Sequence, residues 1–313
     1  MQVCVVGAGA LGSTIGGTLA AGGCEVWLID SYQAHVDAIN HSGLRMVEEE
    51  SERVVTANAR TSADGIPPVD LVIVLVKSFH TRDAVLAVSS VVGPHTVVMS
   101  LQNGLGHEDI IADVIGRERV LAGKTYVGGV FLEAGRVRSG VAGKETVIGE
   151  LDGGSTERVR RIAGAMNSAG LITEVSPNIM GTMWDKLLIN VAGGALTAIT
   201  RLTYGGLYNL PALEECGLTA IAEAMAVARA NGVALSIRDP REAWEKARAG
   251  LGDAFKTSML QSIEKKQPTE VDFLHGSVVR WGARAGVPTP VNSTLVACVK
   301  GIEYATTDYP GKN

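Results

Sequence analysis

The segment Gly7-Ala8-Gly9-Ala10-Leu11-Gly12 decides the fold of this 313-residue chain. It follows a short apolar stretch typical of a buried strand and opens a stretch typical of a helix. In such a setting the first glycine permits a tight turn, the second lets the backbone approach a pyrophosphate, and the third lets helix and strand pack closely. The helix N-terminus then holds the phosphates. The pattern predicts dinucleotide binding by these six residues, and the alternative is a glycine-rich turn in a core of small residues.

Asp30 stands at the end of the next predicted strand, residues 25–29. A carboxylate there accepts hydrogen bonds from the adenosine ribose of NAD and repels the 2′-phosphate of NADP. The neighbouring Ser31 and Tyr32 bring no positive charge. We therefore expect NAD as the preferred cofactor, with NADP possible if Arg45 or Arg53 supplies the missing charge. The alternative is that Asp30 caps a turn and faces solvent.

Strand-like and helix-like segments alternate through the first half of the chain. The stretch 70–77 is an unbroken apolar run typical of a parallel strand buried on both faces. The other predicted strands cover residues 2–6, 25–29 and 96–101, and the predicted helices cover residues 11–21, 35–40, 81–91 and 156–168. This rhythm predicts the α/β class with an N-terminal doubly wound Rossmann sheet. Short runs punctuated by glycine between residues 120 and 151 predict antiparallel strands or hairpins that extend the sheet.

Strand signals largely stop after Pro177. Prolines separate six helix-like stretches, which cover residues 179–199, 212–230, 241–249, 259–265, 271–285 and 293–305. We therefore predict an NAD(P)-binding Rossmann domain over residues 1–175 and a C-terminal all-α domain for substrate binding and dimerisation over residues 176–313. The length of the chain also favours two domains.

Composition excludes several classes of protein. Hydrophobic residues make up 46% and charged residues 19%, which supports a sizeable core and excludes a disordered chain. A net charge of −5 without a basic block argues against nucleic acid as a partner. We place no membrane span, because glycines and charges interrupt every apolar stretch of about 20 residues. The four cysteines lack metal-ligand spacing, so we expect no metal, a reducing compartment and a cytoplasmic protein.

Two polar residues follow strands of the predicted sheet. Lys77 ends the apolar run, and Asn103 comes directly after the strand that follows it. Ligands of doubly wound sheets bind at the carboxyl ends of the strands, so both residues are candidates for a ligand site. The alternatives are a lysine that reaches from a strand end into solvent and an Asn-Gly turn.

The second half supplies a further set of candidates. Lys186 and Asn190 are four residues apart and share one face of an apolar helix. Gly193 and Gly194 follow within that helix, at a cost of about 1 kcal/mol each relative to alanine, which indicates close packing or room for a ligand. Without a ligand, the same pattern describes a surface lysine and an asparagine with its hydrogen bonds satisfied.

Ser258 and Glu270 complete the candidates. Ser258 either caps a helix or lies in its first turn, where a hydroxyl and free N–H groups also bind a carboxylate. Glu270 either caps the helix that follows it or pairs with a lysine inside a cleft.

These motifs together resemble the 2-dehydropantoate 2-reductase (ketopantoate reductase) family over nearly the whole chain. The segments that carry the resemblance are residues 7–12, 75–77, 101–104, 186–190, 196–199, 258–261 and 269–272. The resemblance implies a Rossmann domain and a helical domain with the active site between them. It also implies hydride transfer from NAD(P)H to the C2 ketone of a 2-oxoacid, giving a D-2-hydroxy acid, with ketopantoate converted to pantoate.

The resemblance also assigns roles to the candidate residues. Lys186 would be the general acid, and Glu270 would orient the lysine and the substrate. The substrate would be held by Asn103, Asn190 and Ser258, while Lys77 would help to position the substrate and, with Asn103, the cofactor. The expected partners are a small-molecule 2-oxoacid and a second copy of the chain in a homodimer.

Two positions depart from the family pattern. Asp30 stands where many members carry a basic residue for NADPH, and Gly194 stands where the family usually has a second substrate-binding asparagine. Both departures favour an alternative within the family, an NAD-dependent D-2-hydroxyacid dehydrogenase for a bulkier 2-oxoacid. An alternative of another class is an NAD-sensing protein without turnover, which would not need a proton donor such as Lys186.

Overall fold

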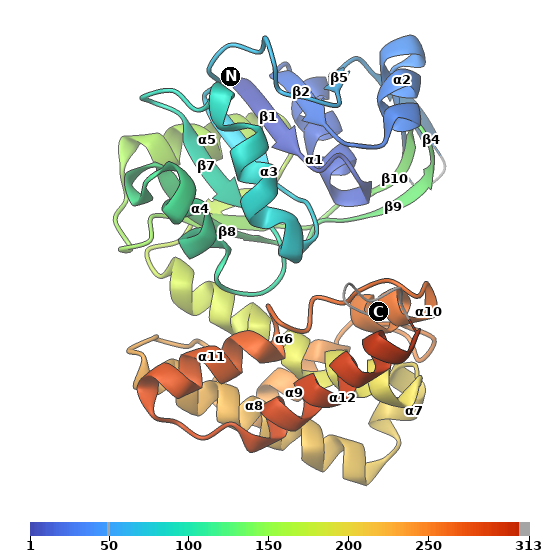
Figure 1. Cartoon of the computed structure of the whole chain (residues 1–313), viewed down its shortest axis with the longest axis vertical. Coiled ribbons are helices and arrows are strands. Elements are labelled where there is room, and N and C mark those ends of the chain that lie inside the picture. The colour runs from blue at the N-terminus through green and yellow to red at the C-terminus, as the bar shows by residue number, and fades with distance from the viewer. Residues whose placement is uncertain (49–50, 307–313) are drawn as a thin grey trace. The chain divides into compact units, whose positions relative to one another are not determined.

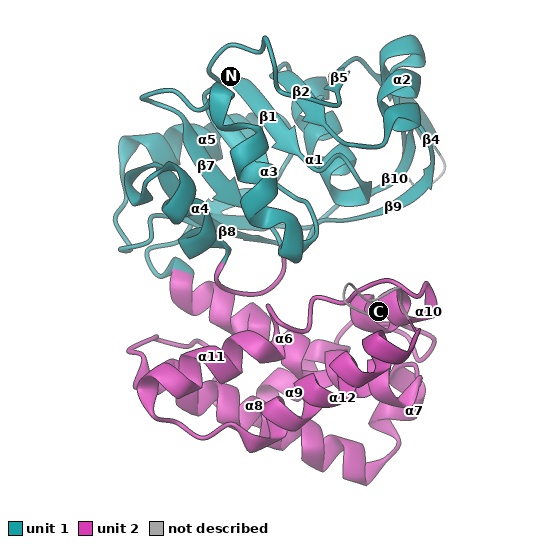
Figure 2. Cartoon of the chain, viewed as in Figure 1, with its two compact units in different colours: residues 1–102, 107–179 teal, residues 103–106, 180–313 magenta. Residues whose placement is uncertain are grey.

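The computed structural model describes residues 1–48 and 51–306 (Figure 1). These residues divide into two compact units (Figure 2). Unit 1 comprises residues 1–102 and 107–179, and unit 2 comprises residues 103–106 together with the chain from Met180 onward. The domain boundary predicted near residue 175 lies just before this division, and residues 307–313 of the predicted second domain lie outside the described residues. The functions assigned to the two domains stay predictions.

Unit 1 is built on an eight-stranded sheet in the order β12-β11-β8-β7-β6-β1-β2-β5. The strands are β1 (Gln2–Val6), β2 (Glu25–Ile29), β5 (Asn58–Arg60), β6 (Leu71–Val74), β7 (Val97–Ser100), β8 (Val120–Thr125), β11 (Thr146–Gly149) and β12 (Thr173–Val175). Neighbouring strands are parallel except β8 and β11, which are antiparallel. The helices are α1 (Ala10–Ala21), α2 (Gln33–Ser42), α3 (Thr81–Ala87), α4 (His107–Ile115) and α5 (Glu157–Ser168). The predicted α/β class with an N-terminal Rossmann sheet is therefore confirmed.

Burial on both faces explains why the central strands are so apolar. Alternate residues of β6 enter different cores: Leu71 and Ile73 belong to one hydrophobic cluster, and Val72 and Val74 belong to another. All four side chains are fully buried. Each such side chain stabilises the fold by about 1.5–3 kcal/mol relative to an exposed position, which leaves polar residues to the strand ends.

A second sheet in unit 1 has the order β4-β3-β10-β9. Its strands are β3 (Leu44–Glu48), β4 (Ser51–Val55), β9 (Gly128–Glu133) and β10 (Arg136–Gly140). The prediction that the glycine-punctuated segments extend the main sheet is correct for β8 and β11 and wrong for the β9–β10 hairpin. That hairpin packs on α1 instead, where a Cβ on Gly129 would lie 2.6 Å from the carbonyl oxygen of Ala10.

Unit 2 is helical. Its helices are α6 (Ile179–Thr200), α7 (Tyr204–Tyr208), α8 (Pro211–Ala230), α9 (Pro240–Arg248), α10 (Ser258–Glu264), α11 (His275–Ala285) and α12 (Pro290–Thr306). Prolines stand at the start of α8 and α9, where the fixed φ and the missing N–H cost nothing. The helix predicted over residues 271–285 begins four residues later, at His275, because residues 270–274 form a turn. Across the described part of the chain, no helix combines the length and the apolarity that a bilayer crossing requires.

Candidate active site

The three glycines of the glycine-rich loop differ in the space available for a side chain. Gly7 has φ +91°, and a Cβ there would lie 2.7 Å from the backbone nitrogen of Val76. A Cβ on Gly12 would lie 1.9 Å from the carbonyl oxygen of Gly7, so only glycine fits at either position. A Cβ on Gly9 would meet no atom within 4 Å, although Gly9 is the N-cap of α1. The fold thus leaves open space at Gly9, where a pyrophosphate fits against the helix N-terminus.

Asp30 lies at the carboxyl end of β2 in unit 1. Its Oδ1 accepts a hydrogen bond of 2.9 Å from the N–H of Tyr32, the N-cap of α2. The residue caps a turn, as one of the two interpretations of the sequence holds. The side chain is half-buried, and Oδ2 accepts no hydrogen bond from any described residue. One carboxylate oxygen therefore remains for a ribose hydroxyl.

Basic residues of unit 1 determine whether a 2′-phosphate could bind beside Asp30. Arg45 pairs with Glu52 at 2.6 Å, and Arg53 pairs with Glu48 at 2.8 Å. Sequence reasoning missed Arg60, whose carbonyl oxygen accepts a hydrogen bond of 3.1 Å from the N–H of Asp30. Arg60 lies on β5, a strand of three residues that the sequence patterns did not reveal. It is the basic residue whose backbone lies directly beside Asp30.

Lys77 stands at the same edge of the sheet as the glycine-rich loop. Beyond the end of β6, the N–H of Leu75 donates to the carbonyl oxygen of Val6 at 2.8 Å, which keeps this segment beside β1. Lys77 is exposed, and its carbonyl oxygen accepts a hydrogen bond from His80 at 2.8 Å in the short turn that follows. Unit 1 thus gathers the glycine-rich loop, Asp30 and Lys77 at the carboxyl ends of adjacent strands.

Helix α6 carries Lys186 and Asn190, both half-buried. Its rotation is fixed by the neighbouring residues. Leu188 is fully buried, and the carboxylate of Asp185 accepts hydrogen bonds from the hydroxyl of Ser236 at 2.6 Å and from backbone N–H groups of residues 236 and 237. The carboxylate anchors α6 to the loop before α9, so the direction in which Lys186 leaves the helix is determined by packing on both sides of it.

The two glycines of α6 differ in their surroundings. A Cβ on Gly193 would lie 2.9 Å from Leu207 Cδ2, so this glycine allows close packing on α7. A Cβ on Gly194 would meet only Met259 Cε, at an ordinary 3.6 Å. Gly194 therefore has room for a side chain on the side that faces α10.

A buried hydroxyl pair joins α6 to the start of α10. Thr197 Oγ1 and Thr257 Oγ1 are 2.7 Å apart, and Thr257 Oγ1 accepts a hydrogen bond from the N–H of Leu260. Thr257 is thus the N-cap, and Ser258 is the first helical residue, with an exposed side chain. The structure selects the first-turn position for Ser258 and fixes it next to the helix of Lys186 and Asn190.

The loop 103–106 and the turn around Glu270 lie together in unit 2. The N–H of Leu105 donates to the carbonyl oxygen of Phe273 at 3.0 Å. A Cβ on Gly104 would lie 2.3 Å from that oxygen, and its φ of +99° also requires glycine. Glu270 accepts a hydrogen bond from the N–H of Phe273 through its carbonyl oxygen, whereas Leu274 is the N-cap of α11. Of the two interpretations of Glu270, the one in which it caps this helix is therefore excluded, and the structure places its turn against the loop 103–106, which contains Asn103.

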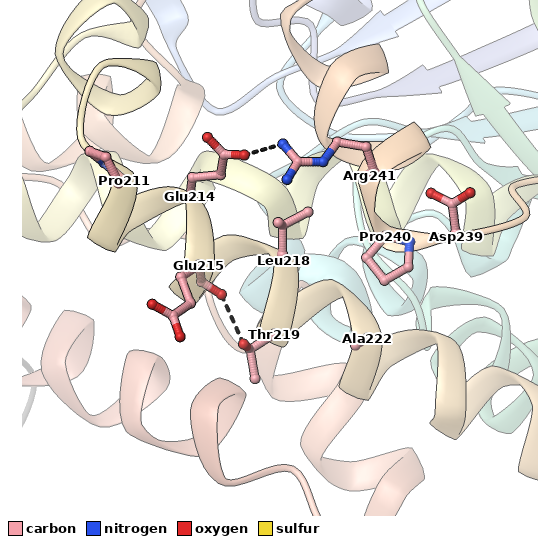
Figure 3. Close-up of a pocket in the computed structure, with 9 residues that line it drawn as sticks. All are labelled: Pro211, Glu214, Glu215, Leu218, Thr219, Ala222, Asp239, Pro240 and Arg241. Carbon is pink, nitrogen blue, oxygen red and sulfur yellow. Dashed lines mark hydrogen bonds and ion pairs between the residues drawn. The ribbon is translucent and has the colours of Figure 1, made fainter.

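A separate groove of about 760 Å³ lies between α8 and α9 (Figure 3). It is lined by Pro211, Glu214, Glu215, Leu218, Thr219, Ala222, Asp239, Pro240 and Arg241. None of the predicted site residues lines it. Within the described residues, no three His, Cys, Asp or Glu side chains are grouped as a metal site would require.

Comparison with known proteins identifies the family. The model of the ketopantoate reductase PanE/ApbA family matches residues 3–153, and the model of its C-terminal region matches residues 178–303. The chain belongs to the ketopantoate reductase family. It is 34% identical to the 2-dehydropantoate 2-reductase of Halobacterium salinarum over 96% of this chain and 98% of the relative. It is 35% identical to that of Pyrococcus horikoshii over 97% of this chain and 98% of the relative.

Solved structures of similar proteins have the same fold. A ketopantoate reductase of this family from Ralstonia eutropha superposes with a TM-score of 0.89, at 34% identity over 98% of this chain and 99% of the other. D-Mandelate dehydrogenase with NADH and anilino(oxo)acetate also superposes with a TM-score of 0.89, at 25% identity over 98% of this chain and 99% of the other. The family resemblance drawn from the sequence motifs is confirmed, and with it the class of enzyme, an NAD(P)H-dependent oxidoreductase of the ketopantoate reductase family.

Proposed function

We propose that this enzyme reduces the C2 ketone of a 2-oxoacid to a D-2-hydroxy acid and prefers NADH. One observation carries the proposal. The Thr197–Thr257 hydroxyl pair holds the first turn of α10, with Ser258, against the helix that bears Lys186 and Asn190. A proton donor and neutral groups suited to a carboxylate are thereby supplied by one rigid unit. A non-catalytic NAD sensor has no use for this arrangement.

The open space at Gly9 and the spare carboxylate oxygen of Asp30 fit a dinucleotide. Residues 7–12 would hold its pyrophosphate, Asp30 its adenosine ribose, and Lys77 and Asn103 would assist in positioning it. The bound coenzyme supplies the hydride for the ketone carbon. Preference for NADH rests on Asp30, because a 2′-phosphate beside its carboxylate would place like charges together.

Lys186 donates the proton in this proposal. As an ammonium group it stabilises the negative charge that develops on the C2 oxygen and then protonates it. Glu270 orients the ammonium group and the substrate. Ser258 and Asn103 bind the substrate carboxylate, which fixes the carbonyl in a reactive orientation. Asn190, one turn along α6 from Lys186, contacts the remainder of the substrate.

Two classes of substrate remain candidates. Ketopantoate is favoured by the relatives at 34–35% identity, which are named 2-dehydropantoate 2-reductases. A bulkier 2-oxoacid is favoured by Gly194, which leaves room for a larger group beside Met259. The similarity to D-mandelate dehydrogenase supports the second class.

Steady-state kinetics test the proposal. The ratio kcat/KM is measured with NADH and NADPH against ketopantoate, 2-oxoisovalerate and phenylglyoxylate. We expect turnover of at least one 2-oxoacid, with NADH as the better coenzyme. Binding of NADH without turnover of any 2-oxoacid would favour the sensor and contradict the proposal.

We also propose that the enzyme is a cytoplasmic homodimer, assembled through the helical unit. A molar mass of twice that of the chain is expected from size-exclusion chromatography with light scattering. The mass of a single chain would contradict the dimer.

A further inference from the structure

A chain of buried hydrogen bonds ends on the glycine-rich loop. Ser13, in the first turns of α1, donates through Oγ to the carbonyl oxygen of Ala8 at 2.6 Å. His35 Nε2 lies 3.0 Å from the same Ser13 Oγ, and the N–H of Gly135 donates to His35 Nδ1 at 2.9 Å. Ser13 is fully buried, and His35 is 1% exposed. Residues more than 100 positions apart are thereby connected in unit 1, where the β9–β10 hairpin packs on α1 (Figure 1).

The geometry fixes every proton in this chain. The backbone N–H of Gly135 can only donate, so His35 Nδ1 is the acceptor and carries no proton. The neutral ring then bears its proton on Nε2, which donates to Ser13 Oγ. The hydroxyl proton of Ser13 remains for the carbonyl oxygen of Ala8. The three hydrogen bonds run in one direction, from Gly135 through His35 and Ser13 to Ala8, so a change at any member reaches the loop.

The Ala8 carbonyl controls the direction of a loop amide. In a trans peptide unit the C=O and the following N–H point in opposite directions. Because Ser13 draws the Ala8 oxygen into the protein, the N–H of Gly9 in the same peptide unit points the opposite way. Gly9 is the position where the loop leaves open space. Ser13 therefore holds a peptide plane at the place proposed for the pyrophosphate.

We infer that Ser13 and His35 are positioning residues that hold the dinucleotide loop in its binding geometry and couple it to the β9–β10 hairpin. This inference rests on the proposed function in so far as the loop binds a dinucleotide. Neither side chain needs to touch the ligand. Phe131 of β9 lies against the His35 ring, with ring centroids 5.0 Å apart, and the burial of His35 keeps water from competing for these hydrogen bonds.

Protonation of His35 would break the chain. A second proton, on Nδ1, would face the N–H of Gly135, so two donors would oppose each other. Burial lowers the pKa of His35 below its ordinary value of 6.5, while the nearby Asp30 carboxylate and a hydrogen bond to the Ala8 backbone act in the opposite direction. Ser13, Phe131 and the Gly135 backbone, which α1 and the hairpin present to the ring, do not titrate in this range. The positioning device is therefore intact at neutral pH and fails in acid.

Calorimetric titration with ADP-ribose tests the inference without relying on turnover. This probe carries the adenosine and the pyrophosphate, has no nicotinamide, and its pyrophosphate diester keeps its charge in mildly acidic solution. For Ser13→Ala we expect the Kd to rise about three- to tenfold, as the loss of one neutral hydrogen bond implies. The matched control is Thr18→Val, which removes a buried hydroxyl of α1 bonded to the Thr14 carbonyl outside the loop. Its Kd should equal that of the unmodified enzyme.

Two variants of His35 separate hydrogen bonding from packing. His35→Gln offers an amide oxygen to Gly135 and an N–H to Ser13 but does not titrate, whereas His35→Leu offers neither. We expect the glutamine variant to bind ADP-ribose like the unmodified enzyme at pH 7.5 and the leucine variant to bind at least threefold more weakly. As the pH falls below the ordinary histidine value of 6.5, affinity should decline in the unmodified enzyme as His35 takes up a proton, and stay level in the glutamine variant.

The outcomes distinguish two kinds of failure. If the unmodified enzyme does not bind ADP-ribose, the dinucleotide site itself is wrong. If it binds and Ser13→Ala binds equally well, the chain of hydrogen bonds has no role in positioning the loop, even if the variant melts at a lower temperature. Equal pH profiles for the unmodified enzyme and His35→Gln would also overturn the inference. If His35→Leu does not fold, the Ser13→Ala variant still tests the inference.

Discussion

Lys186 is the residue whose loss should reduce turnover most. Lys186→Ala removes the proposed proton donor, so we expect kcat to fall roughly 10²–10⁴-fold, the usual contribution of a positioned general acid. The Kd for NADH, measured by fluorescence titration, should change little. Lys246→Ala is a matched control, because Lys246 is a lysine of unit 2 that pairs with Glu242 at 2.9 Å, on a helix without predicted site residues. Normal turnover in Lys186→Ala would assign the acid to another group.

Asp30 should determine the choice of coenzyme. Asp30→Asn removes the charge and keeps an oxygen for the N–H of Tyr32, so the start of α2 is preserved. We expect the ratio of kcat/KM for NADH over NADPH to fall at least roughly tenfold, because the repulsion of a 2′-phosphate is lost. Adding Arg60→Ala to this variant should then lower kcat/KM for NADPH and leave kcat/KM for NADH unchanged. A preference of the unmodified enzyme for NADPH would contradict the prediction.

At the level of secondary structure, the elements that bury apolar faces could be predicted and the partly exposed ones could not. The run Leu71–Val74 is buried on both sides of the sheet, so its composition alone indicates a central strand. Strands β3 to β5 escaped prediction because they bury too few of their residues to form an apolar run, and most of β4 faces solvent. Their pairing depends on partners distant in sequence, such as β10 for β3. Arg60 was missed as a candidate site residue for this reason.

Helix α6 allows a test of substrate size at Gly194. Gly194→Asn places an amide one turn beyond Asn190, and its Cβ would meet only Met259, at an ordinary contact distance. We expect kcat/KM for ketopantoate, relative to phenylglyoxylate, to rise about 2–13-fold, because a hydrogen-bond partner is gained and volume is lost. Gly193→Ala is the contrasting variant, since its Cβ would clash with Leu207 and should lower stability instead. An unchanged ratio in Gly194→Asn would remove residue 194 from the substrate site.

Across the whole molecule, the glycine-rich motif and the change from alternating to purely helical patterns were enough to predict a Rossmann unit followed by a helical one. Contacts between distant segments were beyond such reasoning. The loop 103–106, for example, follows β7 in sequence but belongs to unit 2, because its backbone bonds to Phe273. Thr257, the N-cap of α10, likewise has its hydroxyl 2.7 Å from that of Thr197 on another helix.

The helical unit contains a buried histidine that should make the stability of the protein depend on pH. His275 is fully buried in α11, and its Nδ1–H donates to Asn292 Oδ1 at 2.8 Å. The amide group of Asn292 is oriented by its own donation to Glu223 at 2.7 Å. His275 Nε2 has no hydrogen-bond partner among the described residues, so a proton added there would have no acceptor. Burial accordingly lowers the pKa of His275 from 6.5 to about 4.

Because the folded protein binds this proton less readily than the unfolded chain, the stabilisation is complete above pH 6.5 and is lost as the pH falls toward 4. The pKa shift of His275 corresponds to a loss of unfolding free energy on the order of 3 kcal/mol. Urea denaturation between pH 7.5 and 4 measures it. His35 has a lowered pKa and acts in the same direction, so the comparison is with His275→Gln, in which His35 is unchanged. We expect the variant to be less stable at pH 7.5 but to lose less of its unfolding free energy in acid, and parallel profiles would show that His275 does not titrate in this range.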